Sequence, residues 1–577
     1  MKKIVAFLFL AGSILQANCQ GFLKTNGKRI VNEKGENILL RGMGLGGWML
    51  QEGYMLGVNK EGQQYRIHQR IDSLIGKEKT QEFYDTWLAN HTTKTDIDSL
   101  KAWGFNSVRL PMHYNLYTLP VEDEKLANQQ TWISNGFNMT DELVRWCKAN
   151  KMYLILDLHA APGGQGNDYN IADRDPSKPS LWDSPENQQK TIALWKKLAE
   201  RYKNETTIIA YDIINEPNWG FEDAEKDKNG LSEKKNEPLE KLMREITAAI
   251  REVDKNHIII IEGNGWGNNY TGILDDGLWD NNMVLSFHKY WNYNDQNSIS
   301  HIIKYRDDLN VPVWLGETGE NSNVWFTQAI HLLESNNIGW AWWPLKKLGY
   351  NNPLQVKRND DYNKIADYWN GKTKIPLQVD FYKTLITFAN NTNISKNIFH
   401  KDVVDAMMRQ PFSDETKPFG NNTIVPGKII NATDYDLGKN GFACYDLDTA
   451  NYRVSGKPGV GNKGGTYRND GVDIFREEEN EAVYVGSFES GEWLQYSIDV
   501  KKTGKHKPML YIASNTALNS VQFSVDGAAG HTINVGNTGG MQKWQQYVLP
   551  EMVLKKGLQK IRIKVLNGTI SFKQVKF

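Results

Sequence analysis

The sequence predicts an α/β fold in which a (β/α)8 TIM barrel precedes a small all-β sandwich of the jelly-roll type. Three observations indicate this arrangement. Apolar strand-like runs alternate with helical patterns from about residue 36 to residue 346, and polar or charged residues end at least six of those runs. From about residue 429, short alternating runs are separated by Gly and Asn. Continuous apolar runs are typical of buried parallel strands. Runs in which apolar and polar residues alternate are typical of the strands of a β-sandwich.

Eight strand-like runs and the helical patterns between them favour a closed barrel over an open sheet. The runs are Asn37–Gly44, Asn106–Met112, Met152–His159, Ile208–Glu216, His257–Gly263, Met283–Tyr290, Val311–Gly319 and Ile338–Lys346. The helical patterns include Thr95–Trp103, Thr140–Asn150, Asn187–Tyr202, Leu239–Val253 and Asn323–Ser335. Eight strand–helix repeats favour the barrel. A doubly wound sheet is the alternative, and polar residues at so many strand ends disfavour it because they suggest one ring of site residues.

The domain boundaries follow from changes in the periodicity of the sequence. Residues 20–390 are expected to form the barrel domain, and residues 391–427 a connector because they lack sustained periodicity. Residues 428–577 are expected to form the sandwich, whose spacing of strands suits antiparallel pairing. Its candidate strands are Glu481–Val485, Glu492–Val500, His506–Ala513, Ser520–Val525, Trp544–Leu549, Gln559–Val565 and Thr569–Phe577.

Residues 1–19 have the pattern of a secretory signal peptide. Two lysines precede the apolar run Ile4–Leu10, which is too short to anchor permanently in a bilayer. Small residues suit cleavage before Gln20, although acylation of Cys19 is the alternative. We expect a protein without a membrane span that is secreted, periplasmic or held at the cell surface.

Composition narrows the partners. The 577 residues include 68 basic and 68 acidic side chains, so nothing favours nucleic acid or an anionic membrane surface. After cleavage only Cys147 and Cys444 remain, in different predicted domains, and no metal-ligand spacing is present. We therefore expect a monomer without a cofactor or catalytic metal.

Two of the strand-like runs carry a glutamate where their apolar stretch ends. Glu216 closes the fourth run, and Glu317 closes the stretch Val311–Glu317 of the seventh. A carboxylate at the end of an apolar strand is costly unless it has a partner or a function. The fourth and seventh strands face each other across the mouth of a barrel, where such folds place their chemistry. Two glutamates meeting there suggest an acid and a nucleophile for cleaving glycosidic bonds.

Other polar residues at strand ends can serve this pair. Asn215 can donate a hydrogen bond to a sugar 2-hydroxyl, and Arg109 would lower the pKa of a nearby carboxylate. His159, His288 and Tyr290 can orient carboxylates by hydrogen bonds.

These residues resemble glycoside hydrolase family 5 in type and order over about residues 20–390. The matching motifs are Arg109, His159, Asn215-Glu216-Pro217, His288-Lys289-Tyr290, Gly316-Glu317 and Trp343 within Gly339–Pro344. The resemblance implies that Glu216 is the acid/base and Glu317 the nucleophile. It also implies that Tyr290 binds the nucleophile and that Trp343 floors the subsite of the reacting sugar.

Within that family the chain looks most similar to the exo-β-1,3-glucanase-like branch. Arg41–Trp48, Glu52-Gly53-Tyr54 and Leu158–Gln165 carry this likeness, which implies that Glu52 contacts the sugar. Glu262 also ends a strand, but no Asn precedes it and no family role maps to it, so we expect it to be structural. The implied activity is retaining hydrolysis of a β-glucan, with β-1,3 linkages favoured. A cellulase, a β-1,6-glucanase, a transglycosylase and a non-catalytic carbohydrate-binding protein are the alternatives.

The C-terminal region resembles family 6 carbohydrate-binding modules. The likeness rests on Thr466–Ile474, Gly491–Tyr496 and Gly540–Trp544. It implies that Tyr467 and Trp544 sandwich one sugar ring. It also implies a possible structural calcium ion, for which Thr433 occupies the position of an acidic ligand.

Overall fold

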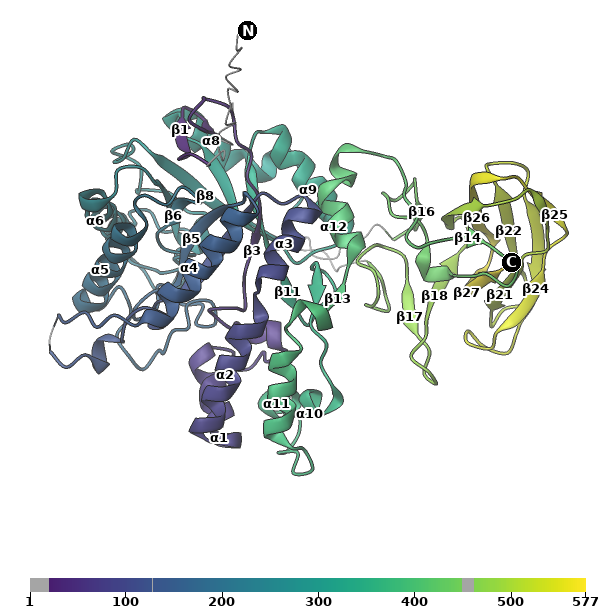
Figure 1. The fold of residues 1–577 in the computed structure, drawn as a ribbon, viewed down its shortest axis with the longest axis horizontal. Coiled ribbons are helices and arrows are strands. Elements are labelled where there is room, and N and C mark those ends of the chain that lie inside the picture. The colour runs from purple at the N-terminus through teal and green to yellow at the C-terminus, as the bar shows by residue number, and fades with distance from the viewer. Residues whose placement is uncertain (1–19, 127, 449–460) are drawn as a thin grey trace, which may run out of the picture.

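The computed structural model describes residues 20–126, 128–448 and 461–577. Eight parallel strands close into a barrel in the order β10-β3-β4-β5-β6-β7-β8-β9 (Figure 1). They are β3 (Arg41–Gly44), β4 (Ser107–His113), β5 (Tyr153–Ala160), β6 (Ile208–Asp212), β7 (Ile258–Glu262), β8 (Met283–Lys289), β9 (Val313–Gly319) and β10 (Gly339–Trp343). Each predicted run coincides with one of them, and only β4 and β5 extend one residue past the predicted end. The barrel is therefore confirmed, and the open sheet is excluded because β10 pairs with β3.

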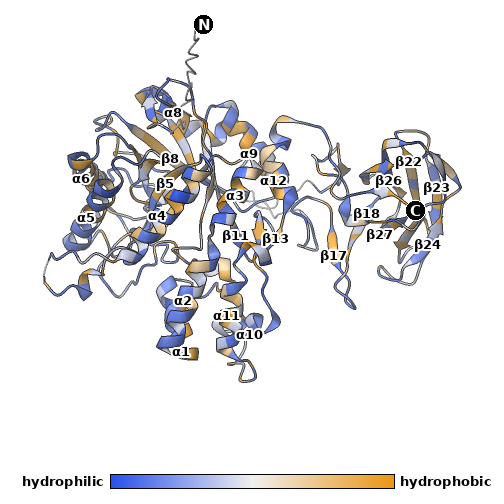
Figure 2. Ribbon diagram, viewed as in Figure 1, coloured by the Kyte–Doolittle hydropathy of each residue, from blue (hydrophilic) through white to orange (hydrophobic). Residues whose placement is uncertain are grey.

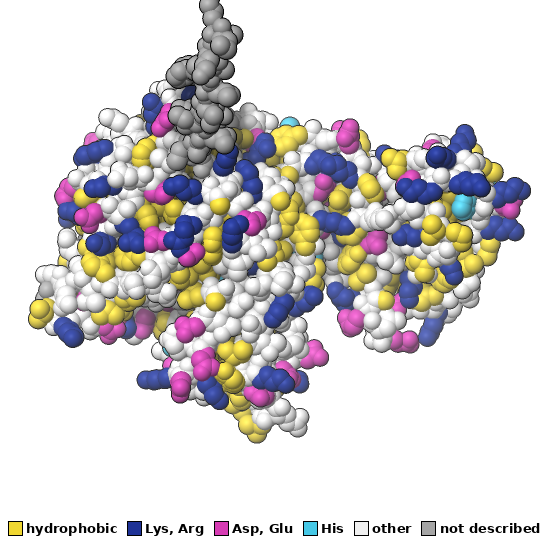
Figure 3. All heavy atoms as spheres, viewed as in Figure 1, with side chains coloured by type: hydrophobic (Ala, Val, Ile, Leu, Met, Phe, Trp, Pro, Cys, Tyr) yellow, Lys and Arg dark blue, Asp and Glu magenta, His cyan; other side chains and the backbone are white. Residues whose placement is uncertain are grey.

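Helices cover the barrel because each buries one apolar stripe. They include α3 (Lys94–Trp103), α4 (Ser134–Ala149), α5 (Pro185–Tyr202), α6 (Glu237–Val253), α8 (Ser300–Leu309) and α9 (Asn323–Ser335). In α6, Leu239, Leu242, Met243, Ile246 and Ile250 are buried, and this spacing places them on one face. Figure 2 shows the strands as largely hydrophobic and the helices as mixed. Charged side chains of both signs are interspersed on the face of the barrel shown in Figure 3.

Four further helices form a smaller cluster below the barrel in Figure 1. They are α1 (Gln64–Ile75), α2 (Lys77–His91), α10 (Asp360–Trp369) and α11 (Phe381–Asn390). Trp87 of α2 and Phe388 of α11 meet in their apolar core, which also includes Trp343 at the end of β10. The cluster therefore supports a residue of the barrel mouth.

The C-terminal part is a sandwich of two mainly antiparallel sheets, as predicted. One sheet has the order β14-β19-β26-β22-β23, and the other β17-β18-β27-β21-β24. Their long strands are β18 (Val483–Glu489), β19 (Trp493–Val500), β21 (Met509–Ala513), β22 (Asn519–Val525), β26 (Gly557–Asn567) and β27 (Thr569–Lys576). The shorter ones are β14 (Thr423–Ile424), β17 (Ile474–Arg476), β23 (His531–Val535) and β24 (Gln545–Val548). A separate apolar core, which includes Leu494, Phe523 and Phe572, lies between the sheets.

The segment expected to be a connector contains a helix that belongs to the barrel's packing. Val403 and Met407 of α12 (Lys401–Met408) lie in the same apolar core as the barrel strands. The helix packs against α9, and Thr327 of α9 donates a 3.0 Å hydrogen bond to the carbonyl oxygen of Ala406. An eight-residue helix gives little periodicity, which is why the sequence does not reveal it.

A buried polar cluster joins the barrel to the sandwich. The carboxylate of Asp402 on α12 accepts hydrogen bonds from Asn323 Nδ2 (2.8 Å) and from the backbone N–H of Asn469 (2.9 Å). Asn323 also donates to Asp470 at 2.9 Å, and Asn469 Nδ2 donates to the carbonyl oxygen of Asn321 at 2.8 Å. All five side chains are buried. Since buried polar groups need defined partners, this cluster specifies one docked orientation of the sandwich.

No helix of the described residues is long and apolar enough to cross a membrane. The predicted signal peptide, residues 1–19, lies outside the described part of the chain.

Replacing Asp402 with Ala should weaken the junction between the domains. The backbone N–H of buried Asn469 would lose its acceptor, which costs about 1–3 kcal/mol. Urea denaturation of the full chain should show a lower midpoint for Asp402→Ala. Asp414→Ala is the control because it removes an exposed ion pair with Lys439, worth about 0–1 kcal/mol. Equal midpoints for the two variants would contradict this account of the junction.

Candidate active site

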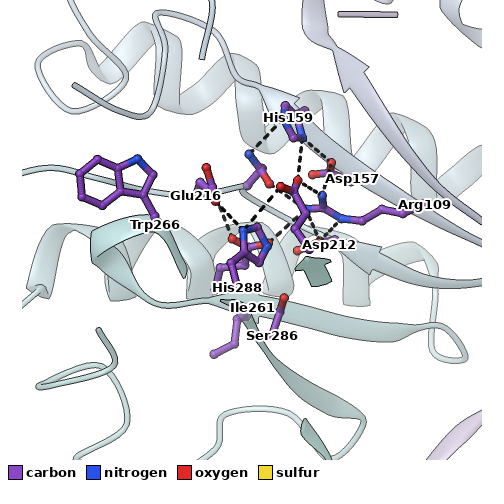
Figure 4. Close-up of polar contacts among 12 residues, drawn as sticks. Arg109, Asp157, His159, Asp212, Glu216, Ile261, Trp266, Ser286 and His288 are labelled. Carbon is purple, nitrogen blue, oxygen red and sulfur yellow. Dashed lines mark hydrogen bonds and ion pairs between the residues drawn. The ribbon is translucent and has the colours of Figure 1, made fainter. Parts of the chain in front are cut away.

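The barrel brings the two predicted glutamates together at one end. Glu317 lies on β9, and Glu216 follows β6 by four residues. One carboxylate oxygen of Glu216 lies within 4.8 Å of one carboxylate oxygen of Glu317, and His288 Nδ1 lies 2.5 Å from Glu216 Oε1 and 3.8 Å from Glu317 Oε2. Figure 4 shows Glu216 beside His288 in a connected set of polar contacts. This proximity suits two carboxyl groups that flank one scissile bond with retention, for which the groups lie about 5–5.5 Å apart.

Glu317 is held through both of its oxygens. Arg109 Nη1 donates to Oε1, and the hydroxyl of Tyr290 donates to Oε2 at 2.9 Å. The Tyr290 contact is the one that the family resemblance implies. A guanidinium and a phenol that donate to one carboxylate stabilise its ionised form and fix its direction. Donors on both oxygens therefore fix the orientation of Glu317.

Glu216 has a different environment. It is buried, and burial raises its pKa to about 7, although the neighbouring imidazole of His288 opposes the rise. His288 Nδ1 lies 2.5 Å from Glu216 Oε1. Burial also disfavours a charge on His288, but the carboxylates of Glu262, Glu317 and Glu216 raise its pKa well above the usual value. A carboxyl group with a pKa near 7 can donate a proton and later accept one.

His159, Asn215 and Glu52 line the same end of the barrel. Burial lowers the pKa of His159 to about 3, so the ring is neutral, and its Nδ1 lies 2.8 Å from Asp157 Oδ2. Arg109 Nη2 donates to Asn215 Oδ1 at 2.8 Å, which leaves the amide N–H groups of Asn215 to donate. Glu52 Oε1 lies 3.9 Å from His159 Nε2, and burial raises the pKa of Glu52 well above its usual value.

Trp343 at the end of β10 packs closely against two glycines, Gly44 and Gly46. A Cβ atom on Gly44 would come within 2.5 Å of the indole, and one on Gly46 within 2.6 Å. The indole is parallel to the His159 ring at 5.0 Å and donates from Nε1 to the hydroxyl of Tyr54 at 3.1 Å. The glycines after Arg41 therefore admit the aromatic side chain at this position.

Comparison with known proteins agrees with this geometry. Residues 60–349, about half of the chain, match the family described as cellulase (glycosyl hydrolase family 5). The chain belongs to glycosyl hydrolase family 5. It is therefore a glycoside hydrolase, and its C-terminal residues 468–576 match a carbohydrate binding module of family 35.

Relatives of this hydrolase carry several names. It is 26% identical over 376 residues to a beta-xylosidase from Phanerodontia chrysosporium, covering 59% of this chain and 74% of that protein. It is 30% identical over 216 residues to endoglucanase C from Acetivibrio thermocellus, covering 37% and 52% respectively. A glucan 1,3-beta-glucosidase from Blumeria graminis is 25% identical over 260 residues, covering 44% and 56%. The chain thus spans only about half of the last two relatives.

The expected family 6 module is wrong, since the match is to family 35. The motifs that suggested family 6 serve the framework. Arg468 donates from Nε to Asp470 at 2.9 Å and lies 3.6 Å from the centroid of the Tyr435 ring, and Tyr496 is in the sandwich core. Framework residues of this kind indicate a sandwich and do not distinguish one family of modules from another.

The two aromatic residues predicted to bind sugar in the module have different neighbours. Tyr467 donates to Asp434 Oδ1 at 2.5 Å, and its ring lies 5.9 Å from that of Phe419 in the connector. Trp544 meets Tyr484 edge to face at 5.3 Å. Each ring therefore packs against a partner of its own.

Sequence reasoning missed two aspartates inside the barrel. Asp157 on β5 and Asp212 on β6 are fully buried, and both face the guanidinium of Arg109, at 3.2 and 2.8 Å. Burial raises the pKa of both aspartates well above the usual value. The signal was an Asp within each apolar strand, two residues before His159 and four before Glu216.

Gly46→Ala should reduce activity by displacing Trp343. The added Cβ would lie 2.6 Å from the indole, so the ring must move, and misplacement by about 1 Å can cost about 10²-fold in rate. Steady-state kinetics on the best substrate would measure the loss in kcat/KM. Gly536→Ala is the matched control because nothing lies within 4 Å of its Cβ position. Unchanged kinetics in folded Gly46→Ala would show that the close packing of Trp343 on Gly46 is not needed for activity.

Proposed function

We propose that this enzyme hydrolyses a β-glucan with retention of configuration, using Glu317 as nucleophile and Glu216 as acid/base. The single observation that supports this most is the 4.8 Å limit on the separation of their carboxylate oxygens. Their environments divide the two roles. Glu317 accepts from Arg109 and Tyr290, which favours a charged nucleophile, whereas burial favours a protonated Glu216 at neutral pH.

The reaction has two steps. A Glu317 oxygen attacks the anomeric carbon while the bond to the leaving oxygen breaks and Glu216 gives that oxygen its proton. Water then attacks the same carbon, Glu216 takes a proton from the water, and the Glu317 carboxylate leaves. Arg109 and Tyr290 donate hydrogen bonds to Glu317 and stabilise its carboxylate when it is released. Asn215 can donate to the 2-hydroxyl of the sugar as positive charge develops.

For the substrate we propose a β-1,3-glucan first and a β-1,4-glucan second. The glucan 1,3-beta-glucosidase relative supports the first choice, and the endoglucanase relative supports the second. Loops between strands determine linkage, and one of them, residues 218–236, joins β6 to α6 and is long. Incubation with a panel of defined β-glucans and chromatography of the products would identify the linkage. Release of monomer only would indicate exo action.

The module would hold the enzyme on a polysaccharide and raise the local concentration of substrate. We also propose export through the signal-like residues 1–19 and action as a monomer. A calcium ion is not part of the proposal. Thr433 offers a hydroxyl and no carboxylate, and the carboxylate of Asp434 already accepts hydrogen bonds from Tyr467 and Asn431.

Transglycosylation is the second candidate, since a sugar hydroxyl could replace water in the second step. Product analysis at high sugar concentration would show longer oligosaccharides in that case. A non-catalytic binding protein is disfavoured because both carboxylates are present and close together.

The stereochemistry of the first product tests the two-step reaction. We expect proton NMR of freshly cleaved β-glucan to show the β-anomer before mutarotation. Glu317→Gln should abolish turnover because an amide cannot form the covalent intermediate. The α-anomer as first product, or full activity in Glu317→Gln, would refute the assignment.

The pH profile tests Glu216. Because burial raises its pKa to about 7, the acid form is lost as pH rises through that value. We expect kcat/KM on a glucan to be constant below pH 7 on this limb and to fall about tenfold per pH unit above it. An alkaline limb near the ordinary carboxyl pKa, about 4.3, would contradict the role of burial.

A further inference from the structure

The acid/base residue has a strained backbone. Glu216 has φ = +42°, in the left-handed region that residues with a Cβ rarely adopt. Such a conformation persists only where neighbours hold it. The carbonyl oxygen of Glu216 accepts from Asn218 Nδ2 at 2.9 Å, and its backbone N–H donates to Glu262 Oε2 at 2.8 Å. Side chains therefore hold the peptide groups on both sides of Glu216.

Glu262 also reaches the other end of the same residue. Its Oε1 lies 3.2 Å from His288 Nε2, and the opposite nitrogen of that ring, Nδ1, lies 2.5 Å from Glu216 Oε1. One carboxylate thus contacts the backbone of Glu216 directly and its carboxyl group through a single imidazole. Figure 4 shows His288 between Glu216 and the Arg109 cluster.

Neutralising Arg109 does not account for Glu262. Its Oε1 lies 3.1 Å from Arg109 Nη2, but the guanidinium already faces Glu317, Asp157 and Asp212. A further buried carboxylate near these acids is costly unless it makes contacts that the others do not. The contacts that distinguish Glu262 are those to Glu216 and His288.

Glu262 does not reach the substrate. It is the last residue of β7 and is fully buried. The turn that begins at Gly263 closes over it, and a Cβ on Gly267 would come within 3.0 Å of its Oε2. Any influence on the reaction must therefore act through its neighbours.

We propose that Glu262 is a positioning residue that holds the acid/base Glu216 at two points, its backbone N–H and, through His288, its carboxyl group. The inference rests on the proposed acid/base role of Glu216. Glu262 aligns the acid for the first step, and it holds His288 as a donor to the Glu216 carboxylate that the first step leaves.

The test compares substrates that differ in their need for an acid. A 2,4-dinitrophenyl β-glucoside, or the β-cellobioside if the parent enzyme prefers it, releases dinitrophenolate, which leaves without protonation. The sugar that leaves from a glucan needs a proton. Glu262→Ala should lose about 10²–10⁴-fold in kcat/KM on the glucan, the range of acid–base catalysis, and much less on the aryl glycoside. Added azide should restore turnover of the aryl glycoside by attacking the glycosyl-enzyme carbon, which displaces Glu317 and requires no base.

Two variants and one control make the outcome decisive. Glu262→Gln keeps an acceptor for the Glu216 N–H and should lose less than Glu262→Ala. Glu216→Ala should show azide rescue, and its absence would refute the proposed function and not only this inference. Asp254→Asn is the control, a buried carboxylate between α6 and β7, at the barrel end opposite the site. It accepts backbone N–H groups of Asn256 and His257, and its replacement should leave the ratio of the two substrates unchanged.

Equal losses on both substrates without azide rescue, in folded Glu262→Ala or Glu262→Gln, would overturn the inference by showing a general structural role. Parent-like activity on the glucan in Glu262→Gln and Glu262→Ala would also overturn it. Thermal unfolding and circular dichroism would establish folding. If Glu262→Ala does not fold, the substrate comparison and azide addition on Glu262→Gln decide.

Discussion

One buried guanidinium organises the reactive end of this barrel. Arg109 projects from β4 and contacts Asp157 on β5, Asp212 on β6, Glu262 on β7 and Glu317 on β9. A barrel interior is usually filled by layers of apolar side chains. The charged side chains of this layer must therefore pair with one another. Side chains of four other barrel strands therefore contact the same cation, and the direction of Glu317 depends on it.

The two glutamates of this cluster have different neighbours. Glu317 accepts from Arg109 and Tyr290, whereas Glu216 lies against His288. Burial raises the pKa of Glu216 to about 7, the negative charge of Glu317 adds to the rise, and His288 opposes it. The neutral His159 and the two buried aspartates complete the layer without adding a competing base.

Sequence patterns predicted most of the fold. Six of the eight barrel strands lie within the expected runs, and β4 and β5 extend one residue past theirs, because strands buried on both faces give long apolar stretches. The residues at strand ends also met at one end of the barrel. The buried Asp157 and Asp212 were missed because a single polar residue inside an apolar run has no periodicity. The helix α12 was too short to recognise, and the module's family was misjudged because its motifs serve packing and domain docking.

The buried cluster around Asp402 has a consequence for how the enzyme meets a polymer. A module on a flexible tether can stay bound while the barrel searches neighbouring bonds. Here the buried polar cluster fixes the orientation of the module relative to the barrel. A module that binds the polysaccharide would therefore limit the barrel to bonds at a fixed distance from the bound site. Cleavage of further bonds would then require the module to dissociate and bind again.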